Sequence, residues 1–287
     1  MKRGVEVKGL LKQIDDFEIG PVDLDFEPGT ITALVGKNGA GKSTFAKLLM
    51  NLAKRDRGEI FLEGQPVSSS SEEWKTKIAY QPQVLLGCNA FNGRELKKLI
   101  SSLYPTWDEE LFIRLVEVFK IPLDKPYGSL SPGVQQQLNF VLSLPRDTDI
   151  LLLDEPTAHM DIHSKQLVQD ELATWMERGE KTMILVSHQV EDIRKLADFI
   201  VVFQEGKILA HAAKDELTQN YKRYWLELEM TDAVPGEIAR KNGRIIVTNQ
   251  SVKTEQFFFE KGIRWIDSER LELEEIISMM LGSREGV

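Results

Sequence analysis

The sequence has very little cysteine: Cys88 is the single cysteine in 287 residues, so no disulfide can form within the chain. One thiol suits a reducing compartment and by itself identifies no site. Long hydrophobic runs are also missing, since none approaches the ~18 residues that a membrane-spanning helix needs. The first ten residues, MKRGVEVKGL, lack the apolar segment of a secretory signal. We therefore expect any role at a membrane to depend on a partner protein.

An excess of positive charge is the third feature that the sequence lacks. It has 36 Lys and Arg against 45 Asp and Glu, which gives a formal net charge of −9. Proteins that bind nucleic acid through its phosphates present basic surfaces, so this charge argues against nucleic acid as a partner. Hydrophobic residues make up 42% and charged residues 28%, the balance of a globular protein with an ample core.

Apolar runs alternate with amphipathic stretches over the first two thirds of the chain. The runs ILLLDEP (150–156) and TMILVSH (182–188) are typical of strands buried on both faces of a parallel sheet. Helical periodicity dominates residues 92–142, and FIVVFQEGKILAH (199–211) predicts a hairpin around Glu205 and Gly206. Strands that alternate with helices predict an α/β fold with a mostly parallel sheet.

The pattern changes near residue 213, and we expect two domains, 1–212 and a small α+β extension, 213–287. Strands are predicted in this extension at YWLELEM (224–230), GRIIVTN (243–249) and GIRWID (262–267). Helices are predicted at VPGEIARKNG (234–243), SVKTEQFFFEKG (251–262) and LELEEIISMMLG (271–282). We expect its core to contain Trp225, Trp265, Phe257–Phe259, Met279 and Met280. The extension carries no recognisable catalytic motif.

A phosphate-binding loop stands out between an apolar strand and an amphipathic helix: GKNGAGKST (36–44) fits the pattern G-x-x-x-x-G-K-[ST]. Its glycines let successive N–H groups point into one anion-sized hollow, to which the following helix adds its positive end. Lys42 is placed to reach the β- and γ-phosphates, and the Ser43 hydroxyl is placed to bind Mg²⁺. We expect the nucleotide to contact Gly36, Lys37, Asn38, Gly39, Ala40, Gly41, Lys42, Ser43 and Thr44.

Two acidic residues, Asp154 and Glu155, end the apolar run ILLLDEP. An Asp at the end of a buried strand downstream of a P-loop is placed for the Mg²⁺ shell. Glu155 follows it and is expected to polarise an attacking water as a general base. These features define a P-loop nucleotide triphosphatase. The guanine signature N-K-x-D of G proteins is absent, and no basic lid of the kinase type is evident.

Four motifs in a fixed order carry a resemblance to one family: GKNGAGKST, LSPGVQQQ (130–137), LLLDEPTAHMD (151–161) and ILVSH (184–188). With them the chain resembles an ATP-binding-cassette (ABC) transporter ATPase over about residues 4–212. The resemblance implies a P-loop cassette with a mostly parallel core sheet, an antiparallel β subdomain and a helical subdomain over about residues 84–142. It also implies a subunit that dimerises head to tail around ATP and Mg²⁺ and hydrolyses the ATP.

The resemblance assigns roles outside the P-loop. Gln83, in YQPQV, matches the Q-loop glutamine that contacts Mg²⁺ or the attacking water, although Gln81 is a rival in the same tetrapeptide. His188 matches the switch histidine that hydrogen-bonds the γ-phosphate. Asp161 matches the D-loop, which crosses the dimer interface.

The signature motif departs from the family pattern L-S-G-G-Q. Leu130, Ser131 and Gly133 fit it, whereas Pro132 and Val134 do not. Ser is a good N-cap and Pro is tolerated at the first helical position, so the helix start is preserved. We expect an altered but usable signature that offers Ser131 and Gly133 to the nucleotide of the opposite subunit.

The nucleobase position also departs from the pattern. Ile14 takes the place of the ring on which the family stacks adenine, and Phe17 is the nearest aromatic residue. An aliphatic side chain gives a base less geometric preference than a ring does, so the choice between ATP and GTP stays open.

The expected function is that of the ATPase subunit that powers a separate integral-membrane permease, on the cytoplasmic face of the cell membrane. The permease would dock around Val84–Leu103, and the dimer partner is a second ATP-binding subunit, identical or different. The C-terminal helix loosely resembles the tail of exporter-type subunits, which favours export. Two alternatives remain, namely a soluble ABC ATPase of translation or DNA repair and a silent regulatory cassette. The net charge argues against the first and the intact Lys42, Asp154, Glu155 and His188 against the second.

Overall fold

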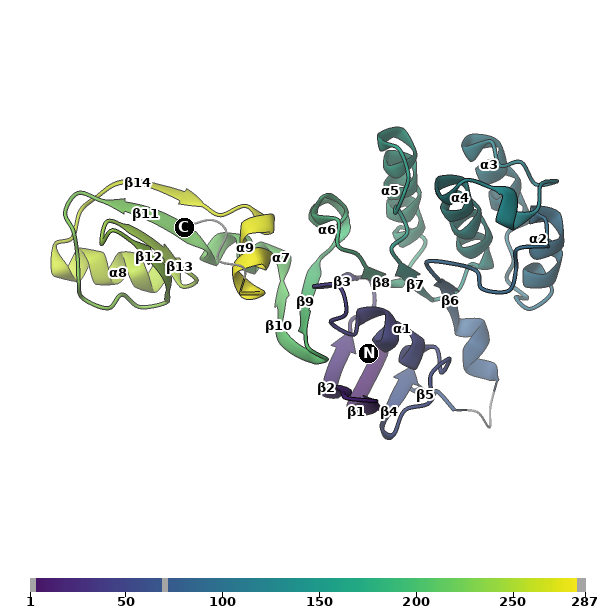
Figure 1. Cartoon of the computed structure of the whole chain (residues 1–287), viewed down its shortest axis with the longest axis horizontal. Helices are drawn as coiled ribbons and strands as arrows, with labels where there is room; N and C mark the ends of the chain where they lie inside the picture. The colour runs from purple at the N-terminus through teal and green to yellow at the C-terminus, as the bar shows by residue number, and fades with distance from the viewer. Residues whose placement is uncertain (1–3, 69–71, 283–287) are drawn as a thin grey trace. The chain divides into compact units, whose positions relative to one another are not determined.

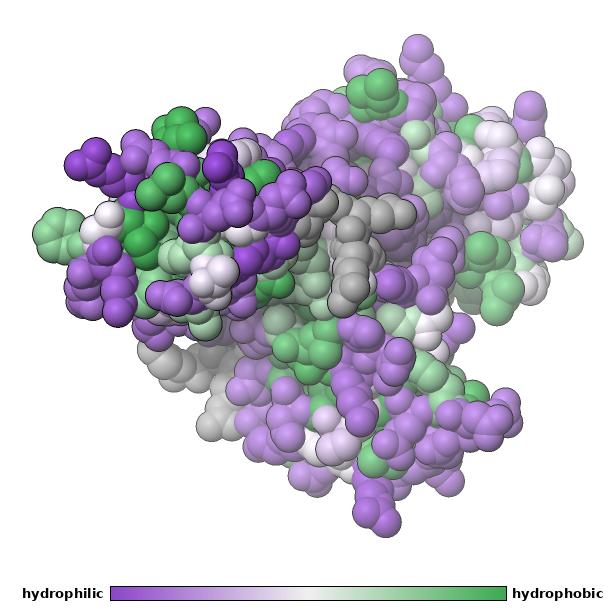
Figure 2. All heavy atoms as spheres, turned by 60° about the vertical axis from the view of Figure 1, so that its left-hand side comes forward, coloured by the Kyte–Doolittle hydropathy of each residue, from purple (hydrophilic) through white to green (hydrophobic). Residues whose placement is uncertain are grey.

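A computed structural model describes residues 4–68 and 72–282 and separates the chain into two compact units. The first unit comprises the residues up to Ala197 together with Phe203–Ile208, and the second comprises Asp198–Val202 together with the residues from Leu209 onward. The division therefore runs through one β-hairpin, and the expected domain boundary at residue 212 stays a prediction. Hydrophilic side chains dominate the face shown in Figure 2, where hydrophobic ones form small groups.

A six-stranded sheet with the order β10-β9-β3-β8-β7-β6 contains the two apolar runs of the sequence. Neighbouring strands β3 and β8, β8 and β7, and β7 and β6 pair in parallel, and every residue of β7 and β8 is buried. The α/β class and the 199–211 hairpin are thus confirmed. The strands are β3 (Ile31–Gly36), β6 (Ile78–Gln81), β7 (Ile150–Asp154), β8 (Thr182–Val186), β9 (Phe199–Gln204) and β10 (Lys207–Ala213).

A second sheet of the first unit is antiparallel and has the order β2-β1-β4-β5. It corresponds to the antiparallel β subdomain that the resemblance implies. A tight turn joins its first two strands, so Ile14 and Phe17 face each other as the last cross-strand pair. Its strands are β1 (Val5–Ile14), β2 (Phe17–Phe26), β4 (Arg57–Leu62) and β5 (Gln65–Pro66).

Helices α2, α3 and α4 lie together and form the helical segment, drawn in blue-green in Figure 1. Their starts are capped as the sequence favours: Asn92 and Glu95 form a capping box on α2, and Asp108 caps α3. A continuous core joins this segment to the sheet, and Leu115, Leu138 and Leu153 in it are fully buried. The helices of the first unit are α1 (Lys42–Leu49), α2 (Gly93–Ser101), α3 (Glu109–Phe119), α4 (Pro132–Ser143), α5 (Ile162–Met176) and α6 (Val190–Leu196), with 3₁₀ turns at Glu73–Lys77, Tyr127–Ser129 and Leu144–Arg146.

The second unit has an antiparallel sheet of order β12-β13-β11-β14, with one helix before its strands, one between the third and fourth strands in the sequence, and one after them. Its elements are α7 (Lys214–Asn220), β11 (Lys222–Leu226), β12 (Glu237–Lys241), β13 (Ile245–Thr248), α8 (Ser251–Lys261), β14 (Trp265–Arg270) and α9 (Leu273–Met280). An α+β extension was expected, although helix α7 was not.

One predicted helix of this unit is wrong. The segment VPGEIARKNG forms strand β12, because Asn242 and Gly243 make a tight hairpin turn into β13. Both turn residues have positive φ, 51° and 64°, which Asn and Gly tolerate better than other residues. The Asn-Gly pair is a strong local hairpin signal, and it outweighs the helical character of EIARK.

The predicted core of the second unit is only partly right. Phe258 is fully buried and packs with Tyr224, which was not among the predicted core residues, whereas Phe259 is 86% exposed and Trp265 is 38% exposed. A helix presents successive residues about 100° apart, so adjacent phenylalanines cannot all face one sheet.

Within the described ranges, no helix is both long enough and apolar enough to cross a bilayer.

Candidate nucleotide site

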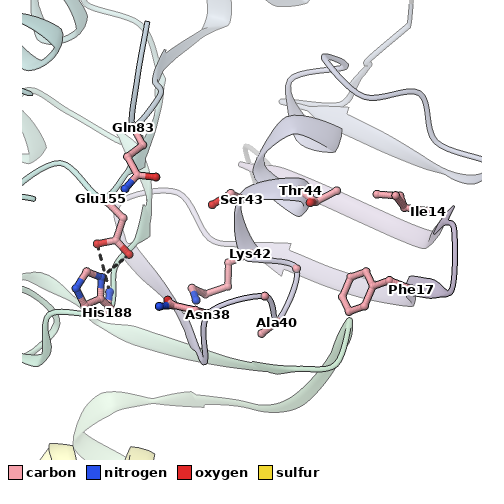
Figure 3. A pocket seen from close by; sticks show the side chains of 12 residues that line it. Ile14, Phe17, Asn38, Ala40, Lys42, Ser43, Thr44, Gln83, Glu155 and His188 are labelled. Carbon is pink, nitrogen blue, oxygen red and sulfur yellow. Dashed lines mark hydrogen bonds and ion pairs between the residues drawn. The ribbon is translucent and has the colours of Figure 1, made fainter. Parts of the chain in front are cut away.

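An open pocket of about 420 Å³ gathers most of the predicted site residues around the P-loop. Figure 3 shows Gln83, Glu155 and His188 on one side of the loop and Ile14 and Phe17 on the other. The pocket is lined by Ile14, Phe17, Asn38, Gly39, Ala40, Gly41, Lys42, Ser43, Thr44, Gln83, Glu155 and His188.

The P-loop backbone has the shape of a phosphate cradle. Gly39 and Gly41 have φ of 80° and 104°, values that other residues rarely adopt. A Cβ on Gly36 would lie 2.3 Å from the carbonyl oxygen of Phe203, so no larger residue fits at that position. Gly41 precedes α1 and offers no side chain to cap it, which leaves the first N–H groups of the helix for an anion.

Lys42 holds its ammonium group inside this cradle. Its Nζ donates to the carbonyl oxygens of Gly36 at 2.6 Å and Lys37 at 3.1 Å. Burial lowers the pKa of Lys42, and the carboxylates of Glu155 and Asp154 oppose that shift. A desolvated cation beside free N–H groups is suited to bind the phosphates of a nucleotide.

Two of the three predicted Mg²⁺ ligands, Ser43 and Asp154, are in contact: the Ser43 hydroxyl donates to Oδ1 of Asp154 at 3.3 Å. Asp154 is 3% exposed, and burial raises the pKa of its carboxyl. Two such oxygen ligands fit Mg²⁺, which takes its remaining ligands from phosphates and water. In the described parts of the chain, no group of three or more His, Cys, Asp and Glu residues is arranged to hold a metal by itself.

Glu155 and His188 form the polar contact drawn with dashed lines in Figure 3, where Nδ1 of His188 lies 2.8 Å from Oε1 of Glu155. The backbone of Glu155 has φ of 52°, in the left-handed region. It is held on both sides, because its N–H donates to Val186 at 2.8 Å and its carbonyl accepts from Nε2 of Gln136 at 2.8 Å. Anchors of this kind fix the carboxylate relative to the loop.

The predicted signature and D-loop residues lie outside the pocket lining and form a second group. A Cβ on Gly133 would lie 2.7 Å from the carbonyl oxygen of His159, so the start of α4 abuts the D-loop. Ser131 caps α4 with Pro132 in the first turn, as the sequence predicts. Asp161 caps α5 and accepts from the Ser164 backbone N–H at 2.9 Å.

Gly36 and Lys37 were predicted to belong to the phosphate loop, but they do not line the pocket. They lie where β3 enters the loop, and their carbonyl oxygens accept hydrogen bonds from Lys42. Gln81, the rival of Gln83, is fully buried within β6, whereas Gln83 lines the pocket.

Sequence reasoning missed the buried residues that support the site. Thr157 donates to Oδ2 of Asp192, and Nε2 of Gln169 donates to Oδ1 of the same carboxylate at 2.6 Å. Asp192 is 1% exposed and ties the segment after Glu155 to α5 and α6. The sequence signal for it is weak, since an acid in the first turn of a helix normally lies in solvent.

Known proteins share these features. A family model described as "ABC transporter" matches residues 19–158. The ABC transporter ATP-binding protein YtrB of Bacillus subtilis (strain 168) is 30% identical over 222 residues, which cover 76% of this chain and 74% of that protein. Nod factor export ATP-binding protein I of Burkholderia orbicola (strain AU 1054) is 31% identical and covers 72% of this chain and 69% of its own length.

An import protein is also similar: Ribose import ATP-binding protein RbsA of Streptococcus agalactiae serotype III (strain NEM316) is 32% identical over 66% of this chain and 40% of that protein. A solved ATP-binding subunit of an ABC transporter has the same fold, with a TM-score of 0.68 and 22% identity over 75% of this chain and 92% of that one.

The fold and the phosphate site together define a P-loop ATPase cassette. The chain belongs to the ABC transporter family, as an ATP-binding subunit that hydrolyses ATP. The predicted family, fold and enzyme class are confirmed.

Proposed function

We propose that this chain is the motor of a two-part transporter and works as a head-to-tail dimer with a separate membrane permease. In this dimer each ATP lies between the P-loop of one copy and Ser131 and Gly133 of the other. The division of the predicted residues into two groups supports the proposal most strongly. Twelve residues line one pocket, while Ser131, Gly133 and Asp161 gather elsewhere on the first unit. A second copy would bring that group to the nucleotide.

The pocket residues have separate roles in this proposal. The P-loop N–H groups and Lys42 bind the phosphates, and Ser43, Asp154 and Gln83 would hold Mg²⁺, which would neutralise phosphate charge. Glu155 takes a proton from the attacking water through a carboxylate oxygen. His188 orients Glu155 through Nδ1, and its other ring nitrogen is assigned to the γ-phosphate in this proposal.

The nucleobase is proposed to bind beside Phe17. This ring approaches the P-loop, since its Cε1 lies 3.3 Å from a Cβ placed on Gly41. Ile14 faces it across the hairpin and is 38% exposed, so both side chains offer apolar surface to a base. A ring and an aliphatic side chain favour a flat aromatic ligand without a hydrogen-bond code for adenine.

The surface proposed for the permease follows directly after Gln83. It consists of large apolar residues that stay exposed in the first unit, and Leu86 is the most exposed of them at 86%. Large apolar side chains that a fold leaves exposed are typical of surfaces that contact another protein. The surface is formed by Val84, Leu86, Phe91, Leu99 and Leu103. A partner bound here would place the subunit at the membrane and would contact the segment that directly follows Gln83 of the pocket.

Because the relatives are named for export and for import, we propose the motor role without a direction of transport.

A membrane co-purification tests the proposal. The wild-type chain is expected to co-purify with one multi-span membrane protein in stoichiometric amount, and reconstituted vesicles of the pair are expected to hydrolyse ATP. Leu86→Glu should abolish this association and leave the basal ATPase activity of the isolated chain unchanged. Leu52→Glu, at an equally apolar and 65% exposed position near the end of α1, is the matched control. Association with ribosomes or DNA in place of a membrane protein would refute the motor role.

A further inference from the structure

Two buried amide side chains stand out because their polar atoms are unpaired. Among the side chains of residues 4–68 and 72–282, the buried atoms without a hydrogen-bond partner are both amide atoms of Gln81 and Oδ1 of Asn139. Gln81 is fully buried and Asn139 is 2% exposed. An unpaired buried amide is costly for folding, so two of them in one core require an explanation.

Asn139 already belongs to a chain of amides that ends at the candidate general base. Its Nδ2 donates to Oε1 of Gln136 at 3.0 Å, and Nε2 of Gln136 donates to the carbonyl oxygen of Glu155 at 2.8 Å. Gln136 and Asn139 are three residues apart on α4 and therefore lie on one face of the helix. Oδ1 of Asn139, which accepts no hydrogen bond from the described residues, is the end of this series of amides that lies farthest from Glu155.

Gln81 lies in β6, a strand against which α4 packs. It is the last residue of β6 and pairs with Leu153 of β7 in parallel register. Side chains alternate along a strand, so Gln81 shares its face with Ala79, which packs in the core beneath the helical segment.

Two hydrogen bonds attach the segment that carries Asn139 to the strands β7 and β6. Near the start of α4, Gln136 reaches the residue that follows β7. Beyond the end of α4, Nη1 of Arg146 donates to the carbonyl oxygen of Tyr80, the neighbour of Gln81, at 3.3 Å. Asn139 lies between these two attachment points along the helix, while Gln81 lies between Tyr80 and the pocket along the strand.

We propose that Gln81 donates to Oδ1 of Asn139 during the ATPase cycle and completes a buried amide relay from β6 to the backbone of Glu155. Gln81 is a positioning residue, since it acts through Asn139 and Gln136 and does not contact the nucleotide. The relay rests on the proposed function, in which Glu155 is the base and the segment after Gln83 contacts the permease. The relay connects the permease contact to Glu155, because Gln81 precedes Gln83 by two residues. A shift of the segment around Gln83 would therefore make or break the hydrogen bond between Gln81 and Asn139.

A double-mutant cycle tests the relay. Gln81→Met and Asn139→Leu keep side chains of similar size. The first removes the donor and the second removes the acceptor of the proposed hydrogen bond between Gln81 and Asn139. Each is expected to lower kcat about tenfold with KM for ATP unchanged, the pattern of an interaction that acts on the chemical step. The double variant should lose no more than either single variant. Thermal unfolding of Gln81→Met should occur at the wild-type temperature or above, because an unpaired amide is replaced by an apolar group.

Controls separate the relay from general damage and from the assignment of Glu155. Thr148→Val removes another buried polar group, at 3% exposure, from the opposite end of β7, and should leave kcat unchanged. Unchanged kcat in Gln81→Met, or a double variant whose losses multiply, overturns the relay. If Gln81→Met does not fold, Asn139→Leu tests the same link, and unchanged kcat there overturns it. Retained turnover in Glu155→Gln would instead refute the base on which the relay acts, whatever the result for Gln81.

Discussion

Nδ1 of His188 lies 2.8 Å from Oε1 of Glu155, and this contact joins the ends of two neighbouring strands, β8 and β7, at the candidate site. A neutral imidazole that donates from Nδ1 keeps Nε2 as an acceptor. Donation from Nε2 to a phosphate therefore requires either the protonated ring or a rotation away from Glu155. The contact makes the orientation of the base dependent on what His188 binds.

Replacing Glu155 by Gln tests the general base. The amide keeps the shape of the side chain but cannot accept a proton, so turnover should fall by about 10²–10⁴-fold. ATP binding should persist and an ATP-bound dimer should accumulate, as measured by nucleotide binding and size-exclusion chromatography. Glu191→Gln, an exposed acid on α6, is the matched control. Retained hydrolysis in Glu155→Gln would exclude Glu155 as the base.

Lys42→Ala tests the phosphate loop. Removing a buried ammonium that faces phosphates costs about 3 kcal/mol, so ATP affinity should fall at least about 100-fold. Equilibrium binding of a fluorescent ATP analogue measures it, with Lys98→Ala on α2 as a control outside the pocket. An affinity equal to wild type would contradict the assignment of the P-loop.

Ser131→Arg tests the signature. Ser131 caps α4 and lies outside the pocket of its own chain, so a bulky cation there should spare ATP binding to the same P-loop. Turnover should fall by about tenfold or more, because the proposed dimer requires close approach at this point when it closes. Ser129→Arg, two residues upstream and exposed, should hydrolyse ATP normally. Normal turnover in Ser131→Arg would refute the role of Ser131 across the interface.

Asp154 should link stability to pH. Burial raises its pKa in the folded state, so the folded protein holds the proton more tightly than the unfolded chain. The buried charge therefore costs stability at neutral pH, and this cost disappears as the pH falls through the raised pKa. Asp154→Asn should raise the unfolding temperature of the nucleotide-free protein at neutral pH, with a gain that shrinks on acidification, and should abolish Mg²⁺-dependent ATP binding.

The charge of Asp56 is expected to stabilise the folded protein at neutral pH, unlike the charge of Asp154. The backbone N–H of Gln13 and the ammonium of Lys12 lower the pKa of this exposed carboxyl. Asp56→Asn should remove stability that is present above the unfolded pKa of an aspartate. A lower unfolding temperature of Asp154→Asn at neutral pH would contradict the burial argument for Asp154. A higher unfolding temperature of Asp56→Asn would contradict the hydrogen-bond argument for Asp56.

Phe258→Ala should destabilise the second unit by about 3–5 kcal/mol, because it opens a cavity in the core. The Phe258 ring packs edge-on against Tyr224, with centroids 5.3 Å apart. Phe259→Ala is the matched control, since the Phe259 side chain is 86% exposed and an exposed substitution changes stability by less than about 0.5 kcal/mol. Differential scanning calorimetry distinguishes the two, and equal losses would contradict the assigned core.

Local patterns in the sequence determined the phosphate loop, the buried strands and the class of protein. GKNGAGKST predicts its cradle because glycine spacing and a following helix are properties of one short segment. ILLLDEP predicts a buried strand because its apolar run needs no information about its neighbours. In the same way, Ser131 and Pro132 predict the start of α4 from capping preferences alone.

Tertiary structure decided how these pieces meet. No local signal tells that Gln136 supports Glu155 or that Asp192 is buried, because both depend on residues from distant segments. The strand β12 is different, because the local Asn242-Gly243 turn signal already pointed to a hairpin and the helical character of EIARK was given too much weight. Phe258 and Phe259 are neighbouring residues of the same type, and only the packing of α8 on its sheet buries the first and exposes the second. Long-range contacts carry the free energy that distinguishes such alternatives, so they cannot be read from neighbouring residues.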